Sequence, residues 1–263
     1  MLILLPPSEG KTGRSRGRRL DPARLSFPEL GERRAEVAAA LTALSAEPHA
    51  AQTLGVSPTL VADLARNRAL LTSPALPALD CYSGVLYDAL SYRSLSPAAQ
   101  RRANRWVIIV SALFGAVRPK DPVVPYRLSM AVNLPGVGPL ASAWKPLLGE
   151  VLPLAAGRGL VIDCRSSTYA AAWAPEGALA HRWIHIAVPG ATHMAKHTRG
   201  LLTRALCTHG VDPRTPERLL DPVREAMGPL FTVELAEPAG RGRPWTLSVT
   251  PPAGPAAGIR VPA

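Results

Sequence analysis

The feature that most constrains the fold is the segment from Trp106 to Ala112, which reads WVIIVSA. It is rich in β-branched residues, and its first polar side chain is Ser111. A strand with apolar residues at consecutive positions is buried on both faces. Similar runs occur at residues 159–163 and 182–188, and an apolar strand candidate spans residues 1–6. Together these segments predict a buried sheet.

Segments with apolar residues at helical spacing lie between the expected strands. They span residues 28–44, 58–71, 143–154 and 192–208, and Ser96-Pro97 is expected to cap a short basic helix. Residues 231–249 alternate around a Gly/Pro/Arg turn, which is typical of a hairpin. This order predicts an α/β fold with a mixed α+β sheet. We expect one domain over residues 1–250 and a Pro/Ala-rich tail over residues 251–263.

The charge balance points to anionic partners. The chain has 263 residues, 47% of them hydrophobic, and a formal net charge of +11. A protein this basic attracts polyanions through its long-range field, so nucleic acid, nucleotides and acidic lipid headgroups are candidate partners. Arginine greatly outnumbers lysine, which also fits a GC-rich coding genome. A basic but inert surface is therefore the alternative.

Several other classes of protein are disfavoured. The sequence has no apolar run of about 18 residues, and it begins with neither a basic n-region nor a small-residue cleavage site. We therefore expect a cytoplasmic protein without membrane association. Cys81, Cys164 and Cys207 lie far apart without a C-x-x-C pair, which argues against a disulfide framework and a zinc site. We expect no metal and no cofactor.

The first polar segment, LLPPSEGKT at residues 4–12, places a loop directly after the first strand candidate. Gly10-Lys11-Thr12 resembles the end of a phosphate-binding loop, but the first glycine of that motif is replaced by Leu5. The segment is therefore not a Walker A loop. A lysine at a strand exit can still hold a phosphate or a carboxylate as a point charge. The alternative is a solvated turn.

The second polar segment, SALFGAVRPKDPVVPYRLSM at residues 111–130, follows the most apolar strand. Open sheets place functional loops at strand ends, and the prolines of this segment would stiffen it. Its candidate anion-binding residues are Arg118, Tyr126 and Arg127. The alternative is a connector pinned by ion pairs between its own arginines and Asp121.

The third polar segment, VIDCRSSTYAAAW at residues 161–173, carries Asp163, Arg165, Ser166 and Tyr169 between a strand and an expected helix start. Backbone amides at such a start, with Arg165 beside them, would suit an anion. The alternative is a plain capping role for the serine.

The fourth polar segment, GATHMAKHTRGLLTRAL at residues 190–206, is expected to be a helix with a basic first half. His193 and His197 are four residues apart, but Met194 follows the first histidine and no third ligand is evident, so we reject a metalloprotease. A basic stripe that includes Lys196 and Arg199 would instead meet phosphate, and a solvated face is the alternative.

These segments, with YSGVLYDAL at residues 82–90 and KHTRG at 196–200, follow one another as in the YaaA peroxide-stress family, the DUF328 or UPF0246 group. The resemblance runs from residue 1 to about residue 235, and its S-x-L-[YF]-G-x-x-R-P-x-D-x-x-x-P-Y-R-L-x-M signature is specific. It implies a compact α/β fold and an association with resistance to hydrogen peroxide. One member binds double-stranded DNA through a helix-hairpin-helix element, for which the turns near Gly55 and Gly84 are candidates here.

Two functional hypotheses follow. The first is a double-stranded DNA-binding protein of the peroxide and oxidative stress response, which clamps phosphates. Its anion-binding residues would be Lys11, Arg118, Tyr126, Arg127, Arg165, Lys196 and Arg199. The second is an enzyme acting on a nucleotide or similar anionic small molecule. Its candidate catalytic residues are Ser8, Glu9, Lys11, Asp163, Ser166, Tyr169 and His193. Convergence of these segments on one concave pocket would favour the enzyme, and a convex basic face would favour DNA binding.

Overall fold

The main sheet has seven strands in the order β10-β11-β9-β8-β1-β3-β4. The computed structural model describes residues 1–190 and 192–252. The strands are β1 (Leu2–Leu5), β3 (Val107–Ser111), β4 (Gly115–Val117), β8 (Val161–Asp163), β9 (Trp183–Ala187), β10 (Thr232–Ala236) and β11 (Trp245–Thr250). The five neighbours from β11 to β3 run parallel, whereas β10 and β4 pair antiparallel at the edges. The predicted α/β fold with a mixed sheet is confirmed.

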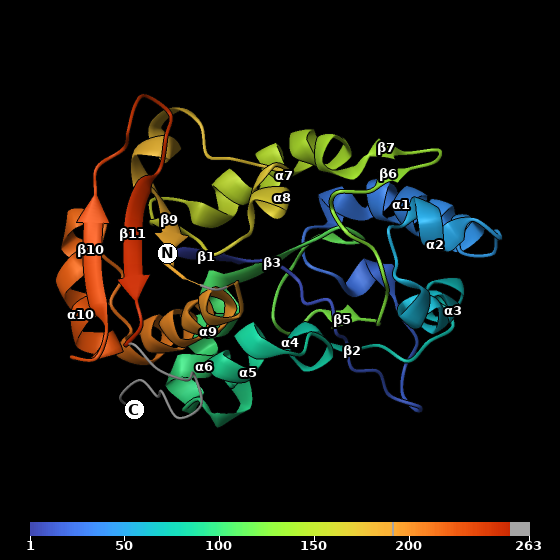
Figure 1. The fold of residues 1–263 in the computed structure, drawn as a ribbon, viewed down its shortest axis with the longest axis horizontal. Coiled ribbons are helices and arrows are strands. Elements are labelled where there is room, and N and C mark those ends of the chain that lie inside the picture. Colours follow the sequence, from blue (N-terminus) through green and yellow to red (C-terminus); the bar gives the residue numbers. More distant parts are fainter. Residues whose placement is uncertain (191, 253–263) are drawn as a thin grey trace.

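Helices cover both faces of this sheet. The α-helices are α1 (Gly31–Leu44), α2 (Ala50–Thr53), α3 (Leu64–Arg68), α4 (Ala78–Cys81), α5 (Val85–Leu90), α6 (Pro97–Trp106), α7 (Leu140–Ala156), α8 (Ser167–Ala170), α9 (Thr192–His209) and α10 (Leu220–Met227). In Figure 1, α5, α6 and α9 lie below the sheet and α7 and α8 lie above it, while α1, α2 and α3 occupy the end opposite β10. The centre of the sheet is therefore shielded from water.

Shorter elements connect these layers. The 3-10 helices are η1 (Pro22–Arg24), η2 (Pro28–Leu30), η3 (Pro58–Asp63), η4 (Tyr92–Ser94), η5 (Gly177–Arg182) and η6 (Glu217–Leu219). Two small antiparallel sheets pair β2 (Leu76–Pro77) with β5 (Pro122–Val123), and β6 (Asn133–Leu134) with β7 (Gly138–Pro139).

The strands lie where the apolar runs predicted them. Every side chain of β3 is buried, as expected for consecutive apolar positions in a covered sheet. The predicted hairpin is formed by β10 and β11, and Ser96 caps α6 by accepting a hydrogen bond from the Ala99 amide. Of the expected tail, residues 251 and 252 belong to the described part of the chain, and residues 253–263 lie outside it.

The expected helix over residues 58–71 is wrong in its type and length. The segment begins as the 3-10 helix η3 and ends as the short helix α3 at Arg68. The Thr72 hydroxyl donates a hydrogen bond to the Ala69 carbonyl, and the Ser73 amide donates to the same oxygen. Such local hydrogen bonds of hydroxyl residues compete with helix continuation, and Pro74 follows immediately.

The strands that follow β1 in the sequence are added first on one side of it and then on the other. The connection from β1 leads to β3 on one side, whereas β8, β9 and β11 follow in turn on the other side. The loops after β1 and β8 therefore diverge at the carboxyl edge of the parallel strands. Open α/β sheets place their ligand sites in the crevice at such a switch point. Among the described residues, no helix is long and apolar enough to cross a membrane.

Candidate functional site

A cavity of about 530 Å³ lies at the carboxyl ends of β1 and β8. Its volume falls within the range of small-molecule sites, roughly 300–1,000 Å³. Segments far apart in the sequence line it: Pro6–Lys11, Leu54 and Gly55, Ser83–Tyr87, Arg127–Ser129, Ser166, Tyr169, Ala195, Lys196 and Arg199. Parts of all four polar segments therefore meet at one concave site.

Lys11 is the buried cation of this cavity. It is 7% exposed, and its ammonium donates hydrogen bonds to the backbone carbonyls of Ser8, at 2.6 Å, and Glu9, at 3.4 Å. Within the described residues it forms no ion pair with a carboxylate, because the Glu9 carboxylate pairs with Arg127 instead. Burial lowers the pKa of Lys11 from 10.5 to about 8. The site thus holds an amine that changes its protonation state close to neutral pH.

Aromatic rings form the inner wall beside Lys11. Its nitrogen lies 4.3 Å from the centroid of the Tyr126 ring and 5.7 Å from that of Tyr82. The Tyr126 hydroxyl forms hydrogen bonds with those of Ser111, at 2.7 Å, and Tyr82, at 3.3 Å. Because Tyr126 is 2% exposed and does not line the cavity, its expected role in anion binding does not fit its position. Its ring instead packs against the Lys11 ammonium.

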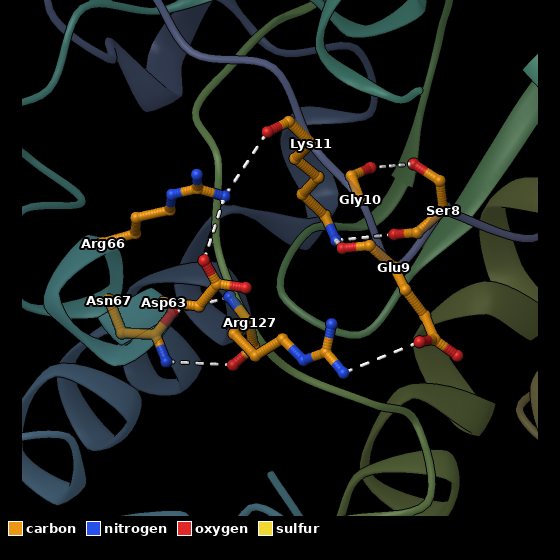
Figure 2. Close-up of polar contacts among 8 residues, drawn as sticks. All are labelled: Ser8, Glu9, Gly10, Lys11, Asp63, Arg66, Asn67 and Arg127. Carbon is orange, nitrogen blue, oxygen red and sulfur yellow. Dashed lines mark hydrogen bonds and ion pairs between the residues drawn. The ribbon is translucent and has the colours of Figure 1, made fainter. Parts of the chain in front are cut away.

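Ser8 holds the turn that precedes Lys11 in the cavity wall. Its hydroxyl donates to the Gly10 carbonyl and accepts a hydrogen bond of 3.0 Å from the Ser83 amide. Figure 2 shows this turn, with the Lys11 side chain directed at the carbonyls of Ser8 and Glu9. The hydroxyl of Ser8 is therefore occupied, and the residue shapes the loop.

Glu9 and Arg127 form the polar rim of the cavity. Their side chains pair at 3.6 Å, and the Glu9 side chain is 79% exposed. The backbone of Arg127 is clamped by the fully buried side chain of Asn67, which donates to its carbonyl at 2.9 Å and accepts from its amide at 2.7 Å (Figure 2). Sequence reasoning missed Asn67, because nothing in its helical context distinguishes it from a surface asparagine.

Asp163 and Arg165 do not line the cavity. Both are fully buried and form a two-point ion pair, with N···O distances of 2.7 and 2.8 Å. Burial opposes ionisation of Asp163, but the charge and hydrogen bonds of Arg165 outweigh it and hold the pKa below its usual value. Arg165 also donates to the carbonyls of Tyr169 and Trp173. The expected roles of Asp163 in catalysis and of Arg165 in anion binding do not fit these positions.

The buried pair instead positions the turn that carries Ser166 and Tyr169 to the cavity wall. Ser166 precedes α8, but its side chain makes no capping hydrogen bond, and α8 is a single turn of four residues. Burial raises the pKa of Tyr169 to about 12. Tyr169 is therefore a neutral hydroxyl group at physiological pH, able to donate a hydrogen bond to a ligand.

The first turns of α9 add two cations. Lys196 is exposed, and Arg199 donates to the Ile186 carbonyl at 3.0 Å. His193 is exposed and does not line the cavity, so its expected catalytic role lacks geometric support. Among residues 1–190 and 192–252, no cluster of His, Cys, Asp and Glu has the arrangement of a metal site.

Arg118 is a predicted anion-binding residue that does not line the cavity. Its guanidinium donates to the Arg105 carbonyl and lies 5.3 Å from the centroid of the Phe27 ring. Its backbone amide, and not its guanidinium, donates to the Asp121 carboxylate, so a hydrogen bond fixes this part of the loop where an ion pair between an arginine and Asp121 was the expected alternative. Arg118 and Arg165 therefore do not line the cavity that contains Lys11.

The two candidate glycine turns both border the cavity. Gly55 and Gly84 have φ values of +62° and +101°, a backbone conformation that favours glycine. The Gly55 and Val56 amides already donate to the carbonyls of Gln52 and Ala51. Residues Ser83–Tyr87 also line the cavity, a contribution that the sequence did not predict.

Comparison with known proteins identifies the family. A family model described as "Peroxide stress protein YaaA" matches residues 1–225. A UPF0246 protein of Streptomyces coelicolor is 45% identical, covering 95% of this chain and 98% of its own length. A UPF0246 protein of Corynebacterium efficiens is 40% identical over 95% of this chain and 100% of its own. One of Corynebacterium glutamicum is 38% identical, with 87% and 93% covered. This chain belongs to the YaaA peroxide-stress family.

Proposed function

We propose that the cavity binds a nucleotide-like anion and that the protein is an enzyme acting on it, in the peroxide-stress response after which its family is described. One observation carries the proposal: acid-base groups and four cations from all four polar segments line the same concave site. DNA binding alone requires phosphate contacts on an accessible surface. It does not require a buried lysine beside a neutral tyrosine.

The charge of the cavity suits a phosphate group. Lys11, Arg127, Lys196 and Arg199 face it, and Glu9 is the only carboxylate among its described lining residues. Since Glu9 pairs with Arg127, the other three cations lack carboxylate partners within the described part of the chain. An entering anion would supply that partner, and the low dielectric of the site would strengthen the attraction.

The same residues can carry out proton transfer. With a pKa of about 8, Lys11 can both accept and release a proton near neutral pH. Tyr169 remains protonated and can donate a hydrogen bond to an oxygen of the ligand. We assign Lys11 as the acid-base group and Arg199 and Lys196 as the residues that hold the anion.

Double-stranded DNA is the second candidate ligand, favoured by a separate observation. Arg14, Arg16, Arg18 and Arg19 are all exposed, and none forms an ion pair within the described residues. This arginine segment begins three residues after Lys11. An exposed cationic strip can track a phosphate backbone and release its counterions.

One paired experiment separates these candidates. Thermal unfolding is measured with AMP, GMP and inorganic phosphate, and labelled duplex DNA is titrated at several salt concentrations. A nucleotide at 100 times its Kd should stabilise the protein by about 2.7 kcal/mol, which corresponds to about 5 °C or more. Arg199→Gln should abolish this shift, whereas Arg101→Gln, an exposed residue of α6, should keep it.

The DNA titration tests the second candidate through the salt dependence of the binding constant. If duplex DNA is the ligand, replacing the four exposed arginines by glutamine should reduce the slope of log K against log salt by up to about 4. Steep, salt-sensitive DNA binding without a shift by any nucleotide would contradict the enzyme proposal and support the second candidate.

A further inference from the structure

The amine of Lys11 is arranged as a nucleophile. The chain has four lysines, and Lys120, Lys145 and Lys196 are exposed, which leaves Lys11 as the buried one. Lys11 lines the cavity, and its nitrogen is held by two backbone carbonyls and the face of the Tyr126 ring. A neutral amine has two N–H bonds, which these carbonyls can accept, so the nitrogen lone pair stays free for an electrophile.

We propose that Lys11 forms an imine with the aldehyde of a phosphorylated sugar in its open-chain form. This inference rests on the proposed function, because the anion site holds the phosphate while Lys11 reacts with the aldehyde. The amine attacks the carbonyl carbon and gives a carbinolamine. The carbinolamine nitrogen then forms a second bond to carbon as the oxygen leaves. The two protons lost by nitrogen depart with that oxygen as water.

The protonation of Lys11 supports this step. At pH 7, a pKa of about 8 leaves roughly one amine in ten neutral, on the order of a hundredfold more than for a lysine at its usual pKa of 10.5. Desolvation of a lysine in a pocket is one way in which proteins activate this residue for Schiff-base chemistry.

The shape of the site selects the electrophile. Because Lys11 is 7% exposed, a slender terminal carbonyl reaches its nitrogen more readily than a branched ketone. Arg199 and Lys196 border the same cavity from α9 and can hold the phosphate of the sugar. Tyr169 can donate a hydrogen bond to the departing oxygen.

Two kinds of molecule carry an aldehyde close to a phosphate group. One is a free pentose phosphate, and the other is the deoxyribose of an abasic site in DNA. The test therefore has two arms, each with sodium cyanoborohydride to reduce the imine: 2-deoxyribose 5-phosphate in one, and a duplex oligonucleotide with one abasic site in the other. A reduced adduct adds the mass of the aldehyde less one oxygen to the intact protein.

Peptide mapping then locates the adduct among the four lysines and the N-terminal amine. We expect it on Lys11, at least tenfold weaker in Lys11→Arg and unchanged in Lys120→Arg, which replaces an exposed lysine. Trapping should rise with pH between 7 and 9. Mapping on the wild-type protein keeps the test decisive even if Lys11→Arg folds poorly.

Two results would overturn the inference: labelling spread evenly over the exposed lysines, or an undiminished adduct in Lys11→Arg. Binding of AMP, which has no aldehyde, is measured in parallel. If AMP stabilises the protein but neither aldehyde is trapped, the covalent step is refuted while the proposed function stands. If AMP does not bind but an aldehyde is trapped on Lys11, the nucleotide assignment fails and the amine chemistry is supported.

Discussion

Replacing Lys11 by methionine should make the protein more stable at neutral pH. The unfolded chain binds the Lys11 proton up to about pH 10.5, whereas the folded protein releases it near pH 8. This lowered pKa means that folding disfavours the ammonium by about 3 kcal/mol at pH 7. Methionine removes that cost, but it also removes the hydrogen bonds that a neutral amine would make, worth about 1 kcal/mol. The expected net gain is about 2 kcal/mol.

The pH dependence identifies the cause of this gain. Between pH 8 and 10.5 the unfolded chain holds more protons on Lys11 than the folded protein does, so wild-type stability rises with pH relative to the variant. At pH 9.5 the cost of the ammonium falls to about 1 kcal/mol, and the two proteins should become equally stable. Active sites often carry such a cost in stability.

Urea denaturation at pH 7 and pH 9.5 measures the difference directly. Lys120→Met is the matched control, because Lys120 is exposed, and its stability relative to the wild type should not change with pH. A Lys11→Met variant that is less stable than the wild type at pH 7 would show that burial of the ammonium does not destabilise the fold. So would a stability difference that is the same at both pH values.

Two further substitutions test the packing around the site. Asp163→Asn leaves the buried guanidinium of Arg165 without its carboxylate. It should lower the free energy of unfolding, measured by urea denaturation, by about 3 kcal/mol. A loss below about 1 kcal/mol would contradict the buried ion pair. Gly200→Ala should cost about 1–3 kcal/mol, because its Cβ would overlap the Leu86 carbonyl where α5 packs on α9. Gly149→Ala is its control, since nothing lies within 4 Å of a Cβ there, and it should keep or raise the melting temperature.

The sequence predicted the sheet well because burial on both faces leaves an unambiguous pattern. The run from Trp106 to Ala112 contains β3, and the other three apolar runs contain β1, β8 and β9. The segment 58–71 was harder, because local hydroxyl and proline effects decided where the helix ended. Apolar spacing alone does not report that competition.

The gathering of strand-end segments was also predictable, because parallel strands end at one edge of a sheet. The sequence did not predict the direction in which each side chain of these segments points. Asp163 and Arg165 stand in a polar loop by sequence, yet their mutual ion pair allows both to be buried. Tyr126 turns inward to meet Ser111, at the start of its own segment, and Lys11, which is distant in sequence. Only tertiary packing distinguishes such residues from those that face the cavity.

Carbon-13 NMR of the lysine side chains would show whether a buried amine lies at the centre of the anion site. The chain has four lysines, and Lys11→Arg assigns the signal of interest. We expect Lys11 to titrate near pH 8 in the free protein and at a higher pH with AMP bound, because a nearby anion stabilises the ammonium. A Lys11 signal that titrates near pH 10.5, or one that saturating AMP leaves unchanged, would contradict an anion site built around a buried amine.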